Sequence, residues 1–183
     1  MTTSISYDPR MLRSRAALRQ GVLELLAREP LEAISIRDIV REAGVGPATF
    51  YRHYATKADL LEDLAAQEIA ALLDVALPVL KSAGSHEAAL ALCRYVEEHK
   101  RLWSALLTGG AAATMRMAFQ KEIRQAGPIL SRQGRRIPLD LATSFGAAGL
   151  LEVLSWWLSE RRDLPADRIA GYLHELVIEP GLH

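Results

Sequence analysis

Side chains that can bind nucleic acid gather between Arg37 and Lys57. Arginine can donate two parallel hydrogen bonds to a guanine edge in the major groove, so Arg37 could read a base; the alternative is a solvated surface arginine. Proline, alanine and threonine can contact a thymine methyl, and threonine can also bond a phosphate. Tyrosine, histidine and lysine here are better suited to phosphate, which fixes register without reading sequence. The candidate DNA-contacting residues are Arg37, Gly46, Pro47, Ala48, Thr49, Tyr51, Arg52, His53 and Lys57.

Two short helices joined by a glycine turn must position these side chains. Ser35 and Asp38 form a capping-box pattern that predicts the start of the first helix. Gly44 stands where a left-handed residue can close that helix, and Pro47 suits the first position of the next one. Phe50 is expected to point into the core. A helix, a short turn and a second helix is the geometry that lays its second helix in the major groove.

A third helix is predicted to start at Lys57, because Thr56 and Asp59 repeat the capping-box pattern. Its N-terminal amides and the Lys57 ammonium could together hold one phosphate. His53 has a second, compatible interpretation as a helix C-terminal histidine favoured by the dipole. Pro78 is expected to end or kink the helix from Lys57, so that residues 57–80 connect the two halves of the chain.

Residues 12–64 resemble the DNA-binding domain of the TetR family of transcriptional regulators. The stretches LRQGVLELLAREP and SIRDIVREAGVGPATFYRHYATKADLL carry the resemblance. The chain departs from the family pattern at Pro30, where Gly is usual, at Gly46, where Ser is usual, and at Tyr54, where Phe is usual. The resemblance implies a three-helix domain. Arg52 stands at the most variable position of the family pattern, so it is the best candidate to determine which DNA sequence is bound. The positions on the family pattern are Thr49, Phe50, Tyr51, His53, Lys57, Leu60 and Leu61.

Composition bounds the class of protein. The 183 residues are 50% hydrophobic, enough for a sizeable core and one or two domains. Lys and Arg total 22, as do Asp and Glu, so the net charge alone does not show what kind of partner the protein binds. Cys93 is the single cysteine of the sequence, so an internal disulfide is excluded, as is usual for a protein in a reducing compartment. Its thiol could be a redox switch or an inert part of the core. No leader and no apolar run of roughly 18 residues is found, so we expect a cytoplasmic protein without a membrane span.

Helical periodicity continues to the end of the chain. Helices are expected at about 85–99, 100–108, 110–133, 138–161 and 165–178, with breaks at Gly109-Gly110, Gly134 and Pro165. The predicted fold is therefore all-α, with an N-terminal helix-turn-helix domain at residues 1–56 and a helical domain at 57–183. The resemblance, weaker here, implies that the second domain binds a small ligand and dimerises through a four-helix bundle.

A face of small residues followed by tryptophan could form the dimer contact, because small residues let helices approach closely. The alternative is that this face packs inside one subunit. Trp156 and Trp157 point about 100 degrees apart on a helix, so both need not be buried within one subunit. The candidate interface residues are Ala142, Gly146, Gly149, Val153 and Trp156.

Aromatic and methionine side chains of the second half are candidates to line a ligand pocket, although such residues are also ordinary core. A mostly apolar pocket would suit an apolar or aromatic effector. The candidates are Tyr95, His99, Trp103, Met115, Met117, Phe119 and Phe145.

Enzyme signatures are weak. His174-Glu175 lacks the second histidine of a zinc protease motif, no phosphate-binding glycine loop occurs, and Glu97, Glu98 and His99 point in different directions on a helix. We therefore expect no metal, no cofactor and no enzyme activity. The expected function is a homodimeric regulator, a repressor that binds a palindromic operator in double-stranded DNA and is released by a small, largely apolar effector. The alternatives are a DNA-binding regulator controlled by a protein partner or by no ligand and, more remotely, a helical enzyme carrying the same domain.

Overall fold

The computed structural model describes residues 9–108, 111–130 and 137–179, with side chains except those of residues 124–130. All secondary structure in these ranges is helical, which confirms the predicted all-α class. Contacts divide the chain into two units, Met1–Leu61 and Glu62–His183. The predicted domain boundary at residues 56 and 57 stays a prediction. The expected breaks at Gly109-Gly110 and Gly134 lie outside the described residues.

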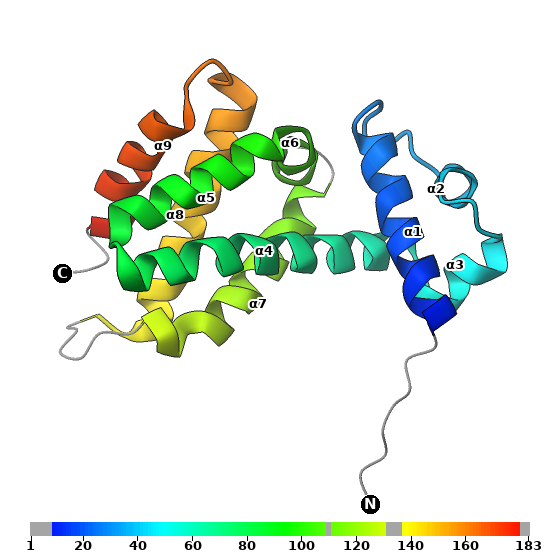
Figure 1. Cartoon of the computed structure of the whole chain (residues 1–183), viewed down its shortest axis with the longest axis horizontal. Helices are drawn as coiled ribbons and strands as arrows, with labels where there is room; N and C mark the ends of the chain where they lie inside the picture. The colour runs from blue at the N-terminus through cyan, green and yellow to red at the C-terminus, as the bar shows by residue number, and fades with distance from the viewer. Residues whose placement is uncertain (1–8, 109–110, 131–136, 180–183) are drawn as a thin grey trace, which may run out of the picture. The chain divides into compact units, whose positions relative to one another are not determined.

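Three helices build the first unit, drawn in blue to cyan in Figure 1: α1 (Pro9–Leu26), α2 (Ile36–Glu42) and α3 (Pro47–His53). Because apolar residues recur at helical spacing in α1, one face of that helix is buried against α2 and α3. The core of this unit contains Leu18, Val22, Leu25, Leu31, Ile34, Ile39, Val40, Phe50, Tyr54, Leu60 and Leu61.

Helix α4 (Lys57–Ser82) begins in the first unit and continues in the second. Pro78 was expected to end or kink this helix. It does not end the helix, which continues for another turn to Ser82. Proline removes one backbone donor, which leaves the carbonyl four residues earlier without its helical partner. Pro78 and Asp74 are both exposed, so water can reach that carbonyl.

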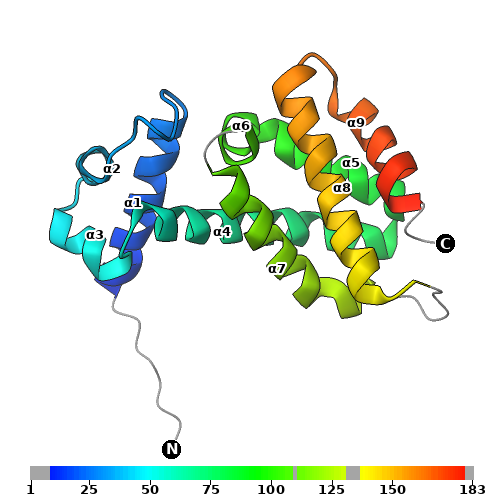
Figure 2. The ribbon, with the colours of Figure 1, turned by 180° about the vertical axis from the view of Figure 1, so that it is seen from behind.

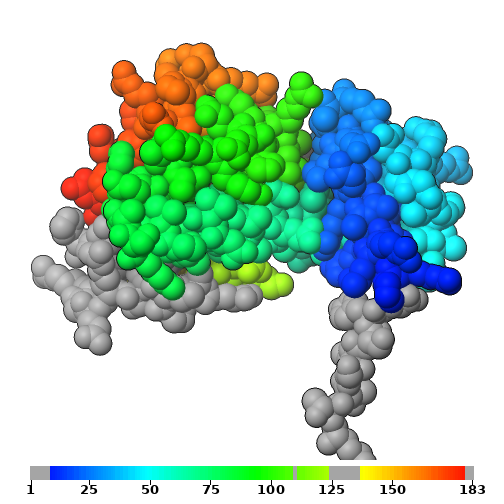
Figure 3. Space-filling model, in the orientation of Figure 1, coloured from blue at the N-terminus to red at the C-terminus, as the bar shows by residue number. Residues whose placement is uncertain are grey.

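The second unit contains most of α4 together with five further α-helices and a π-helical turn. Apolar faces of these elements enclose a core with Val96, Leu106, Leu154 and Ile169 fully buried. Figure 2 shows α8 lying between α7 and α9, and Figure 3 shows the surface formed by α4 and α5. The elements are α5 (Ser85–Glu98), α6 (Lys100–Thr108), α7 (Ala112–Leu130), α8 (Leu139–Glu160), α9 (Ala166–Leu173) and η1 (His174–Ile178).

The end of the second unit differs from the expected single helix at 165–178. The α-helix α9 stops at Leu173 and gives way to the wider π-helical turn η1. The side chain of Val177 in this turn lies against Gly149 of α8, where a glycine leaves room for it. Wide turns of this kind are rare and occur mostly as single turns.

Helix α8 is, within the described part of the chain, the one helix long and apolar enough to cross a membrane by length and composition. Core helices of soluble proteins meet the same two criteria, so this property alone does not indicate a membrane span.

Candidate nucleic-acid interface

The turn between α2 and α3 has the predicted geometry. Gly44 adopts a φ of 63°, a left-handed conformation that glycine reaches without steric cost. The Val45 N–H donates to the Val40 carbonyl oxygen at 3.0 Å, which closes the end of α2. Pro47 occupies the start of α3, and Gly46 caps that helix without a side-chain hydrogen bond. This turn presents α3 as a short helix beside α2.

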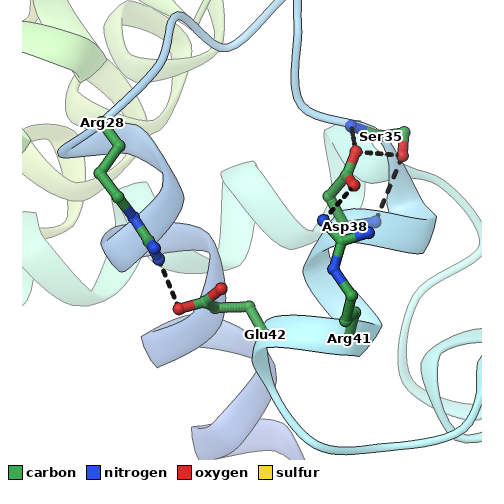
Figure 4. A network of polar contacts seen from close by, with 5 residues as sticks. All are labelled: Arg28, Ser35, Asp38, Arg41 and Glu42. Atoms are coloured by element: carbon green, nitrogen blue, oxygen red, sulfur yellow. Dashed lines mark hydrogen bonds and ion pairs between the residues drawn. The ribbon is translucent and has the colours of Figure 1, made fainter.

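The start of α2 is fixed by the predicted capping box, drawn in Figure 4. The Asp38 N–H donates to Ser35 Oγ at 3.2 Å, and the Ser35 N–H donates to Asp38 Oδ2 at 3.1 Å. The Ser35 hydroxyl and backbone, and then Arg41, lower the pKa of Asp38. In the same network Arg28 bonds Glu42, which joins the segment after α1 to the end of α2.

One face of α3 is apolar and buried, and the rest is exposed. Phe50 is 0% exposed, as predicted, whereas Tyr51 on the adjacent face is 59% exposed. Arg52 is also exposed, and its guanidinium donates to Thr49 Oγ1 at 3.1 Å. Arg37 of α2 is exposed as well. The exposed or half-buried residues along α3 are Gly46, Pro47, Ala48, Thr49, Tyr51, Arg52 and His53.

Helix α1 braces the C-terminal end of α3. Ser14 Oγ and His53 Nε2 lie 2.7 Å apart, and Arg15 Nε donates to the Tyr54 hydroxyl at 3.4 Å. Sequence reasoning assigned His53 to phosphate but did not identify Ser14. No local pattern could have done so, because the two residues are 39 positions apart.

Lys57, predicted to hold a phosphate, is half-buried at the start of α4. Its ammonium donates to the Leu31 carbonyl oxygen at 2.9 Å and to the Ile34 carbonyl oxygen at 2.7 Å. Lysine has three N–H donors, so these bonds use two of them.

Gly21 is a second residue that sequence reasoning missed. A Cβ at this position would lie 3.0 Å from the Ala43 backbone nitrogen and 3.2 Å from the Ile39 carbonyl oxygen. Helices α1 and α2 therefore approach closely here. The signal was an isolated glycine inside a strongly helical pattern, which often marks close backbone packing.

Five of the seven candidate ligand-lining residues are either completely buried or mostly exposed. Trp103, Met115 and Phe119 are completely buried, whereas Met117 and Phe145 are 68% and 66% exposed. Trp103 Nε1 is buried and has no hydrogen-bond partner.

Tyr95 and His99 form a separate pair, with ring centroids 4.3 Å apart. The Tyr95 hydroxyl donates to Glu68 at 3.0 Å. Burial, and then the Glu68 carboxylate, raise the pKa of Tyr95.

The candidate dimer residues on α8 are half-buried, except for Trp156, which is 36% exposed. The neighbouring Trp157 is fully buried, and its Nε1 donates to the Leu164 carbonyl oxygen at 2.9 Å, in keeping with the predicted divergence of the two tryptophans. A Cβ at Gly149 would lie 3.1 Å from Val177, so this glycine faces a segment of its own chain. A Cβ at Gly146 would meet nothing within 4 Å.

Metal and thiol chemistry have little support in the described residues. No group of three or more His, Cys, Asp or Glu side chains there is arranged to hold a metal ion. Cys93 is completely buried, and burial followed by the Glu97 carboxylate raises the pKa of its thiol to about 12. The thiol is therefore protonated and unreactive at neutral pH.

Residues 20–64 match the sequence model of the bacterial regulatory proteins of the tetR family. A stretch of 68 residues is 38% identical to YxbF of Bacillus subtilis, an uncharacterized HTH-type transcriptional regulator. That stretch spans 37% of this chain and only 18% of YxbF, so the similarity concerns a small part of that protein.

The fold is shared over almost the whole chain. A tetR-family transcriptional regulator from Streptomyces coelicolor superposes with a TM-score of 0.66 at 22% identity, over 93% of this chain and 82% of that one. NalD of Pseudomonas aeruginosa, described as the secondary repressor of the MexAB-OprM multidrug efflux pump, superposes with a TM-score of 0.65 at 19% identity. That superposition covers 93% of this chain and 96% of NalD. At these identities the superpositions establish the fold alone.

Proposed function

Because this chain is a DNA-binding transcriptional regulator of the TetR family, we propose that it acts as a homodimeric repressor of a palindromic operator and is released by a small, largely apolar effector. The observation that carries the proposal is that polar side chains of α3, and Arg37 of α2, are exposed on a unit in which Phe50 of α3 is completely buried. The protein would act in the cytoplasm, where bacterial DNA lies.

The proposed DNA contacts follow from side-chain chemistry. Arg52 and Arg37 read base edges, since a guanidinium can bond O6 and N7 of guanine together. The bond from Arg52 to Thr49 limits the rotamers of that arginine before DNA arrives. Pro47 and Ala48 offer apolar contacts to a thymine methyl. Gly46 lets the backbone approach DNA, and Thr49, Tyr51, His53 and Lys57 complete the proposed set as phosphate contacts.

A homodimer is the assembly that a palindromic operator requires, because two recognition helices then enter successive major grooves about one helical turn apart. Exposed apolar side chains on α8 support a contact between copies, since Leu141 and Phe145 are both more than half exposed. Ala142, Gly146, Val153 and Trp156 extend this proposed interface. Gly149 contributes on the inner side, where it lets η1 pack against α8.

The effector site that we propose surrounds Trp103, Met115 and Phe119. These side chains are apolar and buried, and Trp103 Nε1 is a buried donor without a partner. An unpaired buried donor costs about 1–3 kcal/mol, a cost that an effector oxygen could remove. We therefore propose an aromatic or apolar effector with one hydrogen-bond acceptor. Tyr95 on α5 and His99 directly after that helix are further candidates to contact the effector. Met117 and Phe145 are exposed, which favours a contact with a second copy of the chain.

Selection from a random duplex library tests the DNA-binding proposal. Wild-type protein should enrich a palindrome, and the double variant with Tyr51→Ala and Arg52→Ala should enrich none. A selected duplex without two-fold symmetry would contradict the homodimeric operator. Repression is tested with a reporter gene placed behind the selected duplex.

The effector proposal is tested by thermal-shift screening of matched aromatic ketones and aromatic hydrocarbons. A ketone that releases the protein from the selected duplex should bind the Trp103→Phe variant at least about fivefold more weakly, because the ring remains and the donor is gone. Equal binding of ketone and hydrocarbon would remove Trp103 from the proposed site. Release by no compound would favour control by a protein partner.

A further inference from the structure

The Lys57 ammonium lies against the segment that joins α1 to α2. Its two acceptors, the carbonyl oxygens of Leu31 and Ile34, belong to residues whose side chains are buried in the core of the first unit. The Leu31 oxygen also accepts a hydrogen bond from the Ile34 N–H at 3.2 Å. The bond from the Lys57 ammonium is the stronger of the two, because a charged donor makes a stronger hydrogen bond than a neutral N–H. The lysine thus serves as a partner to backbone oxygens of its own chain.

The amides at the start of α4 also have internal partners. The Thr56 N–H donates to Asp59 Oδ2 at 2.8 Å, and the Asp59 N–H donates to Thr56 Oγ1 at 3.2 Å. The Asp59 carboxylate, which is exposed, adds negative charge to this turn and opposes the approach of a phosphate. Several of the donors expected to hold a phosphate here are therefore used within the protein.

The two carbonyl bonds connect the start of α2 to the end of α3. Ile34 directly precedes Ser35, the N-cap of α2, and Tyr54, the C-cap of α3, stands three positions before Lys57. One side chain consequently limits how far α2, with Arg37 on it, can move relative to α3.

We infer that Lys57 is a positioning residue, which supports DNA binding by holding the α1–α2 segment against the first turn of α4 and not by neutralising a phosphate. The inference rests on the proposed DNA-binding function and replaces the phosphate contact proposed for Lys57. The effect on DNA is indirect: without the two bonds, Arg37 and the face of α3 are presented in a wider range of relative positions.

The first arm of the test needs no DNA. Lys57→Met keeps most of the apolar stem and removes all three donors. Amide hydrogen exchange of residues 31–38 should become at least about tenfold faster in this variant, because two charge-assisted bonds are lost. Lys81→Met, in the last turn of α4 and exposed, is the matched control and should leave exchange at 31–38 unchanged. Unchanged exchange in Lys57→Met would overturn the inference.

The second arm measures affinity for the duplex selected with wild-type protein at several salt concentrations. Each lost phosphate contact lowers the slope of log affinity against log salt by about 0.9, so a dimer would lose about two. We expect Lys57→Met to weaken binding by roughly tenfold with the wild-type slope. A slope lower by about two would overturn the inference even if exchange becomes faster.

A third variant guards against a folding defect. Lys57→Arg keeps a cation that can donate to both carbonyl oxygens, so it should recover most of the exchange protection and affinity that Lys57→Met loses. If Lys57→Met is unfolded, Lys57→Arg still tests the inference, because its affinity and its exchange at residues 31–38 should change together. Affinity lost with normal exchange would contradict a positioning role. If the wild-type protein selected no duplex, the proposed function would fail while the exchange arm remained readable.

Discussion

Ser14 Oγ on α1 and His53 Nε2 at the end of α3 lie within hydrogen-bond distance, 2.7 Å apart. The bond joins the first helix of the unit to the last residue of the proposed recognition helix. Together with the bond from Arg15 to Tyr54, it attaches the end of α3 to α1, in addition to the burial of Phe50.

Ser14→Ala should weaken this attachment without altering the residues proposed to contact DNA. The substitution removes the partly buried bond to His53 and an exposed bond from the Ser14 hydroxyl to the Met11 carbonyl oxygen. The partly buried bond is the larger loss, at about 0.5–1.5 kcal/mol, so the free energy of unfolding in urea should fall by about that amount. Affinity for the selected duplex should fall by a few-fold, because α3 is less well held. Ser82→Ala, which removes an exposed bond from the Ser82 hydroxyl to the Pro78 carbonyl oxygen within α4, is the control, and equal stability of the two variants would contradict the bracing role.

Arg52→Ala should relax base preference at one symmetric position of the selected duplex. An arginine bonded to a guanine edge discriminates by about 1–3 kcal/mol, and alanine cannot replace either hydrogen bond. Repeated selection with the variant measures the change position by position. Arg101→Ala removes a positive charge that is also exposed, from α6 in the second unit, and should leave the preference intact. An unaltered preference in Arg52→Ala would exclude this residue from readout.

Gly21→Ala should destabilise the protein although alanine is the better helix former. The new methyl would lie 3.0 Å from a backbone nitrogen and 3.2 Å from a carbonyl oxygen of α2, which cannot move aside as a side-chain end can. Overpacking of this kind costs about 1–3 kcal/mol. Chemical denaturation measures the loss. A more stable Gly21→Ala variant, as helix propensity alone predicts, would show that the two helices can separate without penalty.

Acid should weaken the capping box of α2. The Ser35 hydroxyl, the Ser35 backbone and Arg41 lower the pKa of Asp38 from a model-peptide value near 3.8. A lowered folded-state pKa means that the carboxylate stabilises the fold above the unfolded pKa and loses this effect as pH falls through the folded one. Thermal unfolding of Asp38→Asn should therefore begin at a lower temperature at neutral pH, with the difference from wild type shrinking below about pH 4. A difference that stays constant with pH would exclude the charge as its source.

Local features of the first unit were predictable from the sequence because their partners are close along the chain. The capping box at Ser35 and Asp38 and the left-handed Gly44 each depend on residues within a few positions. Phe50 was predictable as core because it continues the apolar pattern of Ile39 and Val45 in the preceding helix and turn.

Partners distant in sequence were not predictable in the same way. The ammonium of Lys57 bonds carbonyl oxygens 23 and 26 positions away, and every residue carries such an oxygen whatever its side chain. The π-helical turn of η1 was missed for a related reason, since its Val177 packs against Gly149, which belongs to another helix. The expected end of α4 at Pro78 was wrong, because the cost of a proline inside a helix depends on whether water reaches the carbonyl oxygen four residues earlier.

The two glycines of α8 provide a matched test of the proposed dimer. Alanine at Gly149 would meet Val177 of its own chain at 3.1 Å, whereas alanine at Gly146 would meet nothing within 4 Å of the same chain. Both substitutions raise helix propensity. If α8 of a second copy packs over Gly146, the added methyl is repeated in each copy and intrudes on the partner helix, at about 1–3 kcal/mol. Sedimentation should therefore show a dimer at least tenfold weaker in Gly146→Ala, and within about threefold of wild type in Gly149→Ala. Equal dimer affinities in the two variants would move the interface away from this face of α8.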